Sequence, residues 1–289
     1  MILVTGAAGK TGRAVLGRLA NVDEPVRAFI RRPEHAAAVF EAGAHETVVG
    51  DVRDRFTLDE ALGEVRAVFH IPPNMHPDEL LIGRTLIEAS QQAGVERFVY
   101  HSVLQPHIES MPHHWAKMRV EEALFTSELP FTILQPAAYI QNILRQLDSI
   151  QEEGVYRTPY PVDTRLSLVD LEDVAVVAAR VLTKSGHFFA TYELVGTDPL
   201  SQRDVASTIG RILGTEVRAV EIMIEAWEAD ARERGMTGYA IDTLIKMFQC
   251  YEAHGFEGNP GVLGWLLGRQ PNSLEKVVRR TLEASHAAA

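Results

Sequence analysis

The sequence has very little cysteine, no long apolar run and no excess of basic residues. Its single cysteine, Cys250, cannot form a disulfide within the chain, which favours a reducing compartment, and we expect the cytoplasm. No apolar run approaches the roughly 18 residues that a membrane-spanning helix needs. Acidic residues outnumber basic ones by 39 to 28, for a net charge of −11. This balance argues against nucleic acid or an anionic membrane surface as a partner, because both attract clustered Lys and Arg.

What the sequence does have is a strand, a glycine loop and a helix at its very start. The apolar run Met1 to Val4 leads directly into a loop at residues 6–12, so it reads as a core strand and not as a signal peptide. A helix-like run follows over residues 13–20, and residues 25–30 read as a second strand. The first thirty residues therefore predict one βαβ unit.

Three glycines occur at regular spacing in the loop of this unit. Gly6 permits the tight turn out of the strand, Gly9 allows a phosphate to approach the backbone, and Gly12 lets the helix pack close to the sheet. The N–H groups of the loop and the positive end of the helix then favour a pyrophosphate. The spacing is G-x-x-G-x-x-G rather than the commoner G-x-G-x-x-G, and the alternative is a merely structural turn. The position between strand and helix favours dinucleotide binding.

The end of the second strand indicates which dinucleotide is preferred. An acidic residue at this point binds the ribose 2′-hydroxyl of NAD, whereas an arginine accommodates the 2′-phosphate of NADP. Arg31 and Arg32 occupy it, and no acid appears before Glu34. We therefore expect NADP as the cofactor, with NAD possible, and one of the two arginines can be a solvated strand end.

Strands and helices continue to alternate through the first half of the chain. Further strands are expected at residues 46–51, 67–71, 97–102 and 131–134, and helices at 35–44, 56–63, 79–93 and 113–124. In the helix at 79–93, Leu80, Leu81, Leu86, Ile87 and Ala89 are expected to supply the apolar positions. Such alternation predicts an α/β fold with a Rossmann-type, doubly wound parallel sheet.

The alternation weakens beyond about residue 145. Short strands are expected at 167–170, 191–195 and 217–222, helices at 171–182 and from 201, and mostly helix over 225–285. Ser201 and Asp204 have the spacing of a capping box. We expect an NAD(P)-binding domain at 1–145, with segments near 165–195 returning to it, and a smaller, mostly helical lobe for substrate or partner at 146–289.

Ligands of such sheets bind at the carboxyl ends of the strands. This rule, the glycine loop and the helix after the fifth strand together give the residues expected to contact the cofactor, which are Gly6, Ala8, Gly9, Lys10, Thr11, Gly12, Arg31, Arg32, Asp51, Val52, Ile71, Pro72, Ser102, Lys117 and Pro136.

The candidate chemistry lies on the helix after the fifth strand. His113 and Lys117 are four residues apart and share one helix face. In a hydride-transfer site, a lysine here holds the nicotinamide ribose, and a short-chain dehydrogenase has a tyrosine acid where His113 stands. A histidine can donate a proton near neutral pH, so we expect Lys117 and His113 as catalytic residues. The alternative is that Lys117 only binds the cofactor and His113 is a surface residue.

Substrate contacts are expected from Tyr139, Asn142 and Trp115, although packing and capping are equally ordinary roles for the first two. Tyr156, Tyr160, Trp227, Tyr239 and Phe248 can also line an apolar pocket, or simply be core. Other chemistries find little support. His101, His107, His113 and His114 match no common zinc spacing, so no metal is expected, and Ser102 is not in a G-x-S-x-G motif.

Several stretches together resemble the NmrA-like family of atypical short-chain dehydrogenase/reductase proteins. They are VTGAAGKTGRAV (4–15), FIRRP (29–33), GD (50–51), RFVYHS (97–102), HHWAKMRVEEAL (113–124), PFTILQPAAYIQN (130–142) and SLVDLEDVA (167–175). The resemblance implies a Rossmann domain with a smaller C-terminal lobe and a preference for NADP. By position it assigns the pyrophosphate to Gly6, Gly9 and Gly12, the 2′-phosphate to Arg31, and the role of the family's catalytic lysine to Lys117.

Two functions are consistent with these features, because the tyrosine of the Tyr-x-x-x-Lys pair is absent. The first is an NADPH-dependent reductase of an apolar carbonyl, quinone or activated alkene, a type of acceptor that needs little acid assistance. The second is a non-catalytic NADP(H) sensor whose C-terminal helices bind a protein partner. A homodimer is compatible with either function.

Overall fold

The computed structural model describes residues 1–22 and 24–288. The chain divides into two compact units. The first comprises residues 1–109, 113–135 and 174–192, and the second comprises residues 110–112, 136–173 and those from 193 onward. The assignment of cofactor binding to residues 1–145 and of a substrate lobe to residues 146–289 stays a prediction.

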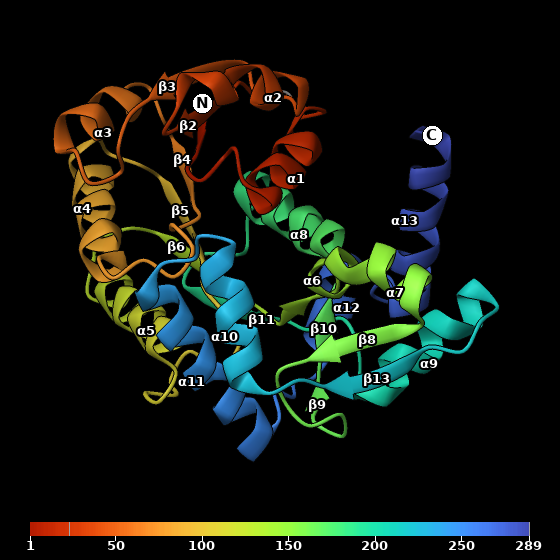
Figure 1. Cartoon of the computed structure of the whole chain (residues 1–289). Coiled ribbons are helices and arrows are strands. Elements are labelled where there is room, and N and C mark those ends of the chain that lie inside the picture. The colour runs from red at the N-terminus through yellow and green to blue at the C-terminus, as the bar shows by residue number, and fades with distance from the viewer. Residues whose placement is uncertain (23, 289) are drawn as a thin grey trace. The chain divides into compact units, whose positions relative to one another are not determined.

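A seven-stranded sheet organises the first unit (Figure 1). Its strands are β1 (Ile2–Val4), β2 (Val26–Ile30), β3 (Glu46–Val49), β4 (Ala67–His70), β5 (Arg97–His101), β6 (Phe131–Pro136) and β11 (Ala190–Leu194), in the order β11-β6-β5-β4-β1-β2-β3. β1 pairs in parallel with both β2 and β4, so the strand order reverses at β1. The predicted doubly wound sheet is confirmed, and the crevice at the carboxyl end of β1 is the place where such sheets bind ligands.

Helices cover both faces of this sheet. They are α1 (Lys10–Leu19), the short 3₁₀ turn η1 (Pro33–His35), α2 (Ala36–Glu41), α3 (Arg55–Ala61), α4 (Glu79–Gln92), α5 (Pro112–Phe125) and α8 (Leu171–Thr183). Apolar side chains of α3, α4 and α5 form one buried core with the sheet face that carries Leu3, Val68 and Phe98. Figure 1 shows α1 and α8 on the opposite side of the sheet.

The helix α4 shows one difference from the sequence-based expectation. Leu81 was expected to be an apolar core position, but its side chain is exposed and Ile82 is buried in its place. An amphipathic pattern predicts which side of a helix is buried, but it leaves the edge of that side uncertain by one residue, because adjacent residues on a helix are 100° apart.

The second unit is built from short strands and many helices. Its elements are β7 (Ala138–Tyr139), α6 (Ile140–Ile143), η2 (Leu144–Gln146), α7 (Leu147–Glu153), β8 (Val155–Thr158), β9 (Arg165–Leu166), β10 (Leu168–Val169), β12 (Leu200–Ser201), α9 (Gln202–Leu213), β13 (Arg218–Glu221), α10 (Ile224–Glu233), α11 (Gly238–His254), α12 (Gly261–Leu267) and α13 (Leu274–Ala288). β7 pairs with β10, β9 with β12, and β8 with β13. The capping box predicted at Ser201 and Asp204 is confirmed at the start of α9.

Two buried aspartates organise the polar interior of the second unit. Asp170 accepts hydrogen bonds from both terminal nitrogens of Arg280, at 2.9 and 3.0 Å, and from Asn272 Nδ2 at 2.7 Å. Asp173 accepts from Arg269 Nη2 at 2.6 Å and from the backbone N–H of Asn272 at 2.6 Å. Because both carboxylates are fully buried, these bonds fix the C-terminal segment to the start of α8.

In the part of the chain that the structure describes, no helix is long and apolar enough to cross a membrane.

Candidate functional site

The glycine loop adopts a conformation that side chains would obstruct. Gly6 has a φ of +61°, and a Cβ on it would lie 2.8 Å from the carbonyl oxygen of Ile71. A Cβ on Gly12 would lie 2.5 Å from the Cα of Ala7. The Gly9 N–H donates to the Gly6 carbonyl at 3.0 Å, and α1 begins at the next residue. The loop therefore presents backbone at the N-terminus of α1, as a phosphate cradle requires.

The other predicted loop residues surround this turn. Ala8 and Thr11 are half-buried and Lys10 is exposed. Thr5, which precedes the loop, accepts a hydrogen bond from the Ile71 N–H at 3.0 Å, and its Oγ1 lies 2.9 Å from His70 Nδ1. This contact ties the carboxyl end of β1 to that of β4. It brings Ile71 and Pro72, both predicted cofactor contacts, to the same edge as the glycine loop.

Charged residues gather at the ends of β2 and β3. The Gly50 N–H donates to the Ile30 carbonyl at 2.9 Å, so Arg31 and Asp51 follow the ends of two adjacent strands. Asp51 accepts two hydrogen bonds from the Arg53 guanidinium, at 2.6 and 3.0 Å. These bonds, together with the Arg53 backbone N–H, lower the pKa of the Asp51 carboxyl to about 2. The carboxylate is therefore ionised and already paired.

The remaining predicted residues at this end differ in their exposure to solvent. Arg31 and Arg32 are exposed, and Val52 is half-buried. Arg32 lies 4.0 Å from Glu34, which is a weak surface pair. Arg53 was not among the predicted site residues. A cation two residues after a strand-end acid was the available sequence signal.

Lys117 lies in a corner made by three elements of the first unit. Its Nζ donates to Glu79 Oε1 at 2.7 Å and lies 5.9 Å from the centroid of the Tyr100 ring. The Tyr100 hydroxyl donates to the same Glu79 oxygen at 3.3 Å. Burial raises the pKa of Tyr100 well above its ordinary value, so this phenol is a poor acid despite its closeness to Lys117. Sequence reasoning did not identify Glu79 or Tyr100.

One turn further along α5, Glu121 joins the ends of two strands. It accepts hydrogen bonds from the Ser102 hydroxyl and, at 2.9 Å, from Gln135 Nε2. Burial raises the pKa of Glu121 from its ordinary value, although these hydrogen bonds oppose the shift. The hydroxyl of Ser102, a predicted cofactor contact, is therefore oriented by its hydrogen bond to a buried carboxyl group.

His113 is buried, which rules out the alternative that it is a surface residue. Its ring meets that of His114 edge-on, with centroids 4.4 Å apart. Burial, followed by the charge of His114 and of Lys117, lowers the pKa of His113 to about 2. The imidazole is therefore neutral at physiological pH and holds no ready proton for donation.

The predicted substrate residues lie in both units. Trp115 is half-buried on α5 of the first unit. In the second unit, Tyr139 precedes α6 and is half-buried, whereas Asn142 lies within α6 and is exposed. Pro136 is the buried last residue of β6.

Three of the other candidate aromatics form one cluster in the second unit. The rings of Trp227 and Phe248 are 4.8 Å apart, and those of Phe248 and Tyr160 are 5.9 Å apart. Tyr156 is buried and its hydroxyl lies 3.2 Å from the Gln202 side-chain oxygen, whereas Tyr239 is at the surface.

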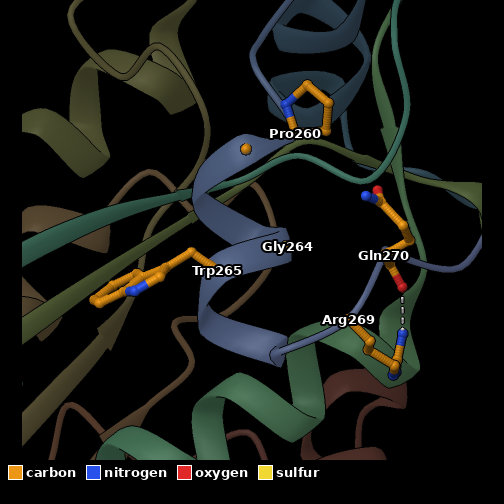
Figure 2. Close-up of a pocket in the computed structure, with 6 residues that line it drawn as sticks. Pro260, Gly264, Trp265, Arg269 and Gln270 are labelled. Atoms are coloured by element: carbon orange, nitrogen blue, oxygen red, sulfur yellow. Dashed lines mark hydrogen bonds between the residues drawn. The ribbon is translucent and has the colours of Figure 1, made fainter.

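A pocket of about 400 Å³ lies against α12 in the second unit (Figure 2). It is lined by Pro260, Gly261, Gly264, Trp265, Arg269 and Gln270. Figure 2 shows Arg269 and Gln270 on one side of α12 and the Trp265 ring on the other. Arg269 Nη1 donates to the Gln270 carbonyl at 2.8 Å, so the guanidinium serves the local fold. None of the predicted site residues lines this pocket. Over the described residues, no group of three or more His, Cys, Asp or Glu side chains could hold a metal ion.

Comparisons with known proteins relate this geometry to reductases. The chain is 31% identical over 253 residues to an NAD(P)H azoreductase of Xenophilus azovorans, covering 86% of each chain. It is 34% identical over 230 residues, 78% of each chain, to (4-alkanoyl-5-oxo-2,5-dihydrofuran-3-yl)methyl phosphate reductase of Streptomyces griseus. The crystal structure of an NADPH-dependent quinone oxidoreductase from Escherichia coli in complex with NADPH has the same fold. Its TM-score is 0.85 at 24% identity, over 98% of this chain and 100% of that one.

The family relationship extends over nearly the whole sequence. The glycine loop, the lysine on α5 and the doubly wound sheet occur together in this chain, as the resemblance of its motifs implied. A family-wide sequence description matches residues 1–286, and we conclude that the chain belongs to the NmrA-like family.

Proposed function

We propose that this protein is an NADPH-dependent reductase of an apolar, conjugated acceptor such as a quinone, a carbonyl compound or an activated alkene. Two relatives above 30% identity are named as reductases, one of them as an NAD(P)H-dependent enzyme. A reducing compartment such as the cytoplasm, which suits a chain with one cysteine, supplies the reduced cofactor.

The glycine loop is the observation that carries the proposal. A Cβ at Gly12 or at Gly6 would collide with backbone atoms, so the first unit keeps a backbone-lined turn at a helix N-terminus. A pyrophosphate fits such a turn. Arg31 follows the end of β2, and we expect it to bind the 2′-phosphate. We expect the Lys117 ammonium to bind the nicotinamide ribose. When bound, NADPH supplies a hydride from its reduced nicotinamide.

The protein's own residues explain which acceptors are suitable. His113 is neutral and Tyr100 is a poor acid, so neither is equipped to deliver a proton during hydride transfer. In a quinone or an activated alkene, the added charge is delocalised over the acceptor, and water can supply the proton afterwards. Lys117 adds a positive charge that favours the developing anion.

The test combines binding with turnover in one sample. NADPH and NADH are titrated by calorimetry, and oxidation of the bound nucleotide is then followed by absorbance with quinones, enones and azo dyes. Tight binding of NADPH followed by its oxidation is the expected result. If neither NADPH nor NADH binds, the proposed function is wrong.

A second function, that of a non-catalytic NADP(H) sensor, has one observation in its favour. Apolar side chains of the second unit are exposed at Met236, Tyr239, Val262 and Trp265, and the last two are three residues apart on α12. Residues at this spacing share a helix face, and an exposed apolar face is typical of a protein-binding surface. Tight NADPH binding without oxidation by any acceptor of the panel would favour this function.

A further inference from the structure

We infer that Glu79 is a positioning residue, which fixes the ammonium of Lys117 in the orientation that binds the nicotinamide ribose. The inference rests on the proposed function, because it assumes that Lys117 contacts the cofactor. Glu79 was not among the residues selected from the sequence, and it does not itself need to touch a ligand.

Glu79 is buried, so the stability of its carboxylate depends on its hydrogen-bond partners. Its side chain is only 1% exposed, and it receives the Lys117 ammonium at 2.7 Å and the Tyr100 hydroxyl at 3.3 Å. A buried carboxylate is costly unless it is paired and hydrogen-bonded. Glu79 is also in the first turn of α4, where the helix dipole favours a negative charge. The buried carboxylate is therefore stabilised by its contact with the ammonium, and the contact holds the ammonium in place.

The contact leaves the lysine available to a ligand. An ammonium group has three N–H donors, and the bond to Glu79 uses one of them. The Lys117 side chain keeps 14% of its surface exposed, in contrast to the buried Glu79. A tethered ammonium on a partly exposed side chain, with two further N–H donors, can bind a second acceptor such as a ribose hydroxyl.

Helix packing sets the position of this pair. A Cβ on Gly83 of α4 would lie 2.7 Å from both methyl carbons of Val120 on α5, so the two helices approach closely at this point. Glu79 precedes Gly83 by one turn, and Lys117 precedes Val120 by one turn. The close packing of α4 against α5 therefore keeps the backbone positions of Glu79 and Lys117 near each other.

Tyr100 closes the third side of the corner. Its ring centroid lies 5.9 Å from Lys117 Nζ and 5.7 Å from the stacked ring of His70. A free lysine loses considerable rotamer entropy when it orders against a ligand. In this corner the lysine is already ordered, so binding does not carry that cost.

A positioning role can be distinguished from a structural one by comparing two ligands. NADPH has the nicotinamide ribose, whereas adenosine 2′,5′-bisphosphate has only the adenine half of the molecule. We expect Glu79→Gln to weaken NADPH binding about tenfold, the order of one misdirected charge-assisted hydrogen bond, and to leave the bisphosphate unchanged. Isothermal titration calorimetry measures both.

Two further variants strengthen the test. Lys117→Met should give a selective loss at least as large, and the double variant should lose little more than Lys117→Met alone, since Glu79 acts through Lys117. Glu79→Asp keeps the charge and serves if Glu79→Gln does not fold, with an intermediate loss expected for NADPH alone. Asp170→Asn alters another fully buried carboxylate, in the second unit, and controls for loss of stability.

The outcomes separate the inference from the proposed function. A selective loss of NADPH binding supports the inference. An equal loss for both ligands, or no loss, would overturn it while NADPH binding by the unaltered protein upholds the proposed cofactor. Failure of the unaltered protein to bind NADPH would overturn the proposed function and the inference with it.

Discussion

Gly83 of α4 lies directly against Val120 of α5, with space for no side chain between them. A methyl group on Gly83 would come within 2.7 Å of both Val120 methyl carbons, which is closer than packed carbon atoms allow. The same helix pair carries Glu79 and Lys117 one turn earlier. The close approach at Gly83 thus lies one turn from the contact between the ammonium and the carboxylate.

Gly83→Ala should therefore destabilise the first unit. We expect it to lower the free energy of unfolding by about 1–3 kcal/mol, as overpacking does, and to weaken NADPH binding as well. Urea denaturation measures the first effect and calorimetry the second. Gly17→Ala is the control, because a Cβ there has only an ordinary contact at 3.8 Å, and alanine should stabilise α1 by up to about 1 kcal/mol. Equal stability of the two variants would contradict the packing argument.

The glycine loop predicts different effects for two of its members. Gly12→Ala should lower the free energy of unfolding by about 1–3 kcal/mol, because its Cβ would meet the Ala7 Cα at 2.5 Å. Gly9 is exposed and a Cβ there would be 3.3 Å from the Gly6 carbonyl oxygen, which needs only a small adjustment. Gly9→Ala should change the free energy of unfolding by less than about 0.5 kcal/mol and still weaken the binding of NADPH. Urea denaturation and calorimetry on both variants test this separation; a large loss of stability in Gly9→Ala would argue against it.

Arg31 should determine the preference for NADPH. Arg31→Ala should weaken NADPH binding by about tenfold to a hundredfold, the range for loss of a charge-assisted bond to phosphate, and leave NADH within about twofold. Arg32→Ala is the matched control, because Arg32 is also exposed and lies near Glu34. Calorimetric titration with both nucleotides gives the ratio. If both nucleotides weaken equally, the assignment of the 2′-phosphate to Arg31 is wrong.

The buried Asp170 should make the second unit sensitive to acid. Burial alone raises the pKa of this carboxyl, but hydrogen bonds from Arg280, Asn272 and Gln141 outweigh it and leave the pKa below its ordinary value. A carboxyl with a lowered pKa in the folded state stabilises the protein above its unfolded pKa, and this contribution is lost as the pH falls through the folded value. Asp170→Asn should cost about 2–4 kcal/mol near neutral pH, and less as the pH falls below the ordinary pKa of an aspartate.

The control for Asp170 is an exposed ion pair of the same unit. Asp163 accepts from Arg203 at 2.7 Å, and both side chains are well exposed, so Asp163→Asn should change stability by less than about 1 kcal/mol. Urea denaturation at neutral and acidic pH compares the two variants. A similar small effect for Asp170→Asn would mean that its arginine and asparagine partners find water in its place.

Local features of the fold were readable from the sequence. Gly6 and Gly12 indicated the turn, because only glycine is tolerated at those two backbone positions. Ser201 and Asp204 indicated the start of a helix, because in a capping box the side chain of each residue accepts a hydrogen bond from the backbone N–H of the other. The alternation of apolar runs was sufficient for the sheet, since the inner strands β1, β4, β5 and β6 are buried on both faces.

The polar interior was not readable in the same way. Glu79 and Lys117 are 38 residues apart, and their meeting depends on the packing of α4 against α5 rather than on any local pattern. The burial of His113 and the reach of Glu121 to the ends of β5 and β6 depend on tertiary packing as well. Charge and periodicity indicate which residues can be functional, but the partners of a buried group come from the assembled fold.

Four buried histidines predict a steep loss of stability in weak acid. Burial lowers the pKa of His70 and His101 to about 3, of His113 to about 2 and of His114 to about 4, against an ordinary value of 6.5. All four are neutral in the folded protein and become protonated on unfolding below pH 6.5. Each therefore contributes stability that is fully present above pH 6.5 and is lost as the pH falls toward its folded value.

Well below pH 6.5, the free energy of unfolding should fall by about 1.4 kcal/mol per pH unit for each of these histidines. Urea denaturation between about pH 7.5 and pH 5 measures the combined slope. His114→Gln, which can still donate to the Gln105 carbonyl that His114 Nδ1 contacts at 3.1 Å, should remove one histidine's share. A stability that is flat over this range, or a slope unchanged in His114→Gln, would show that the buried imidazoles gain protons without unfolding.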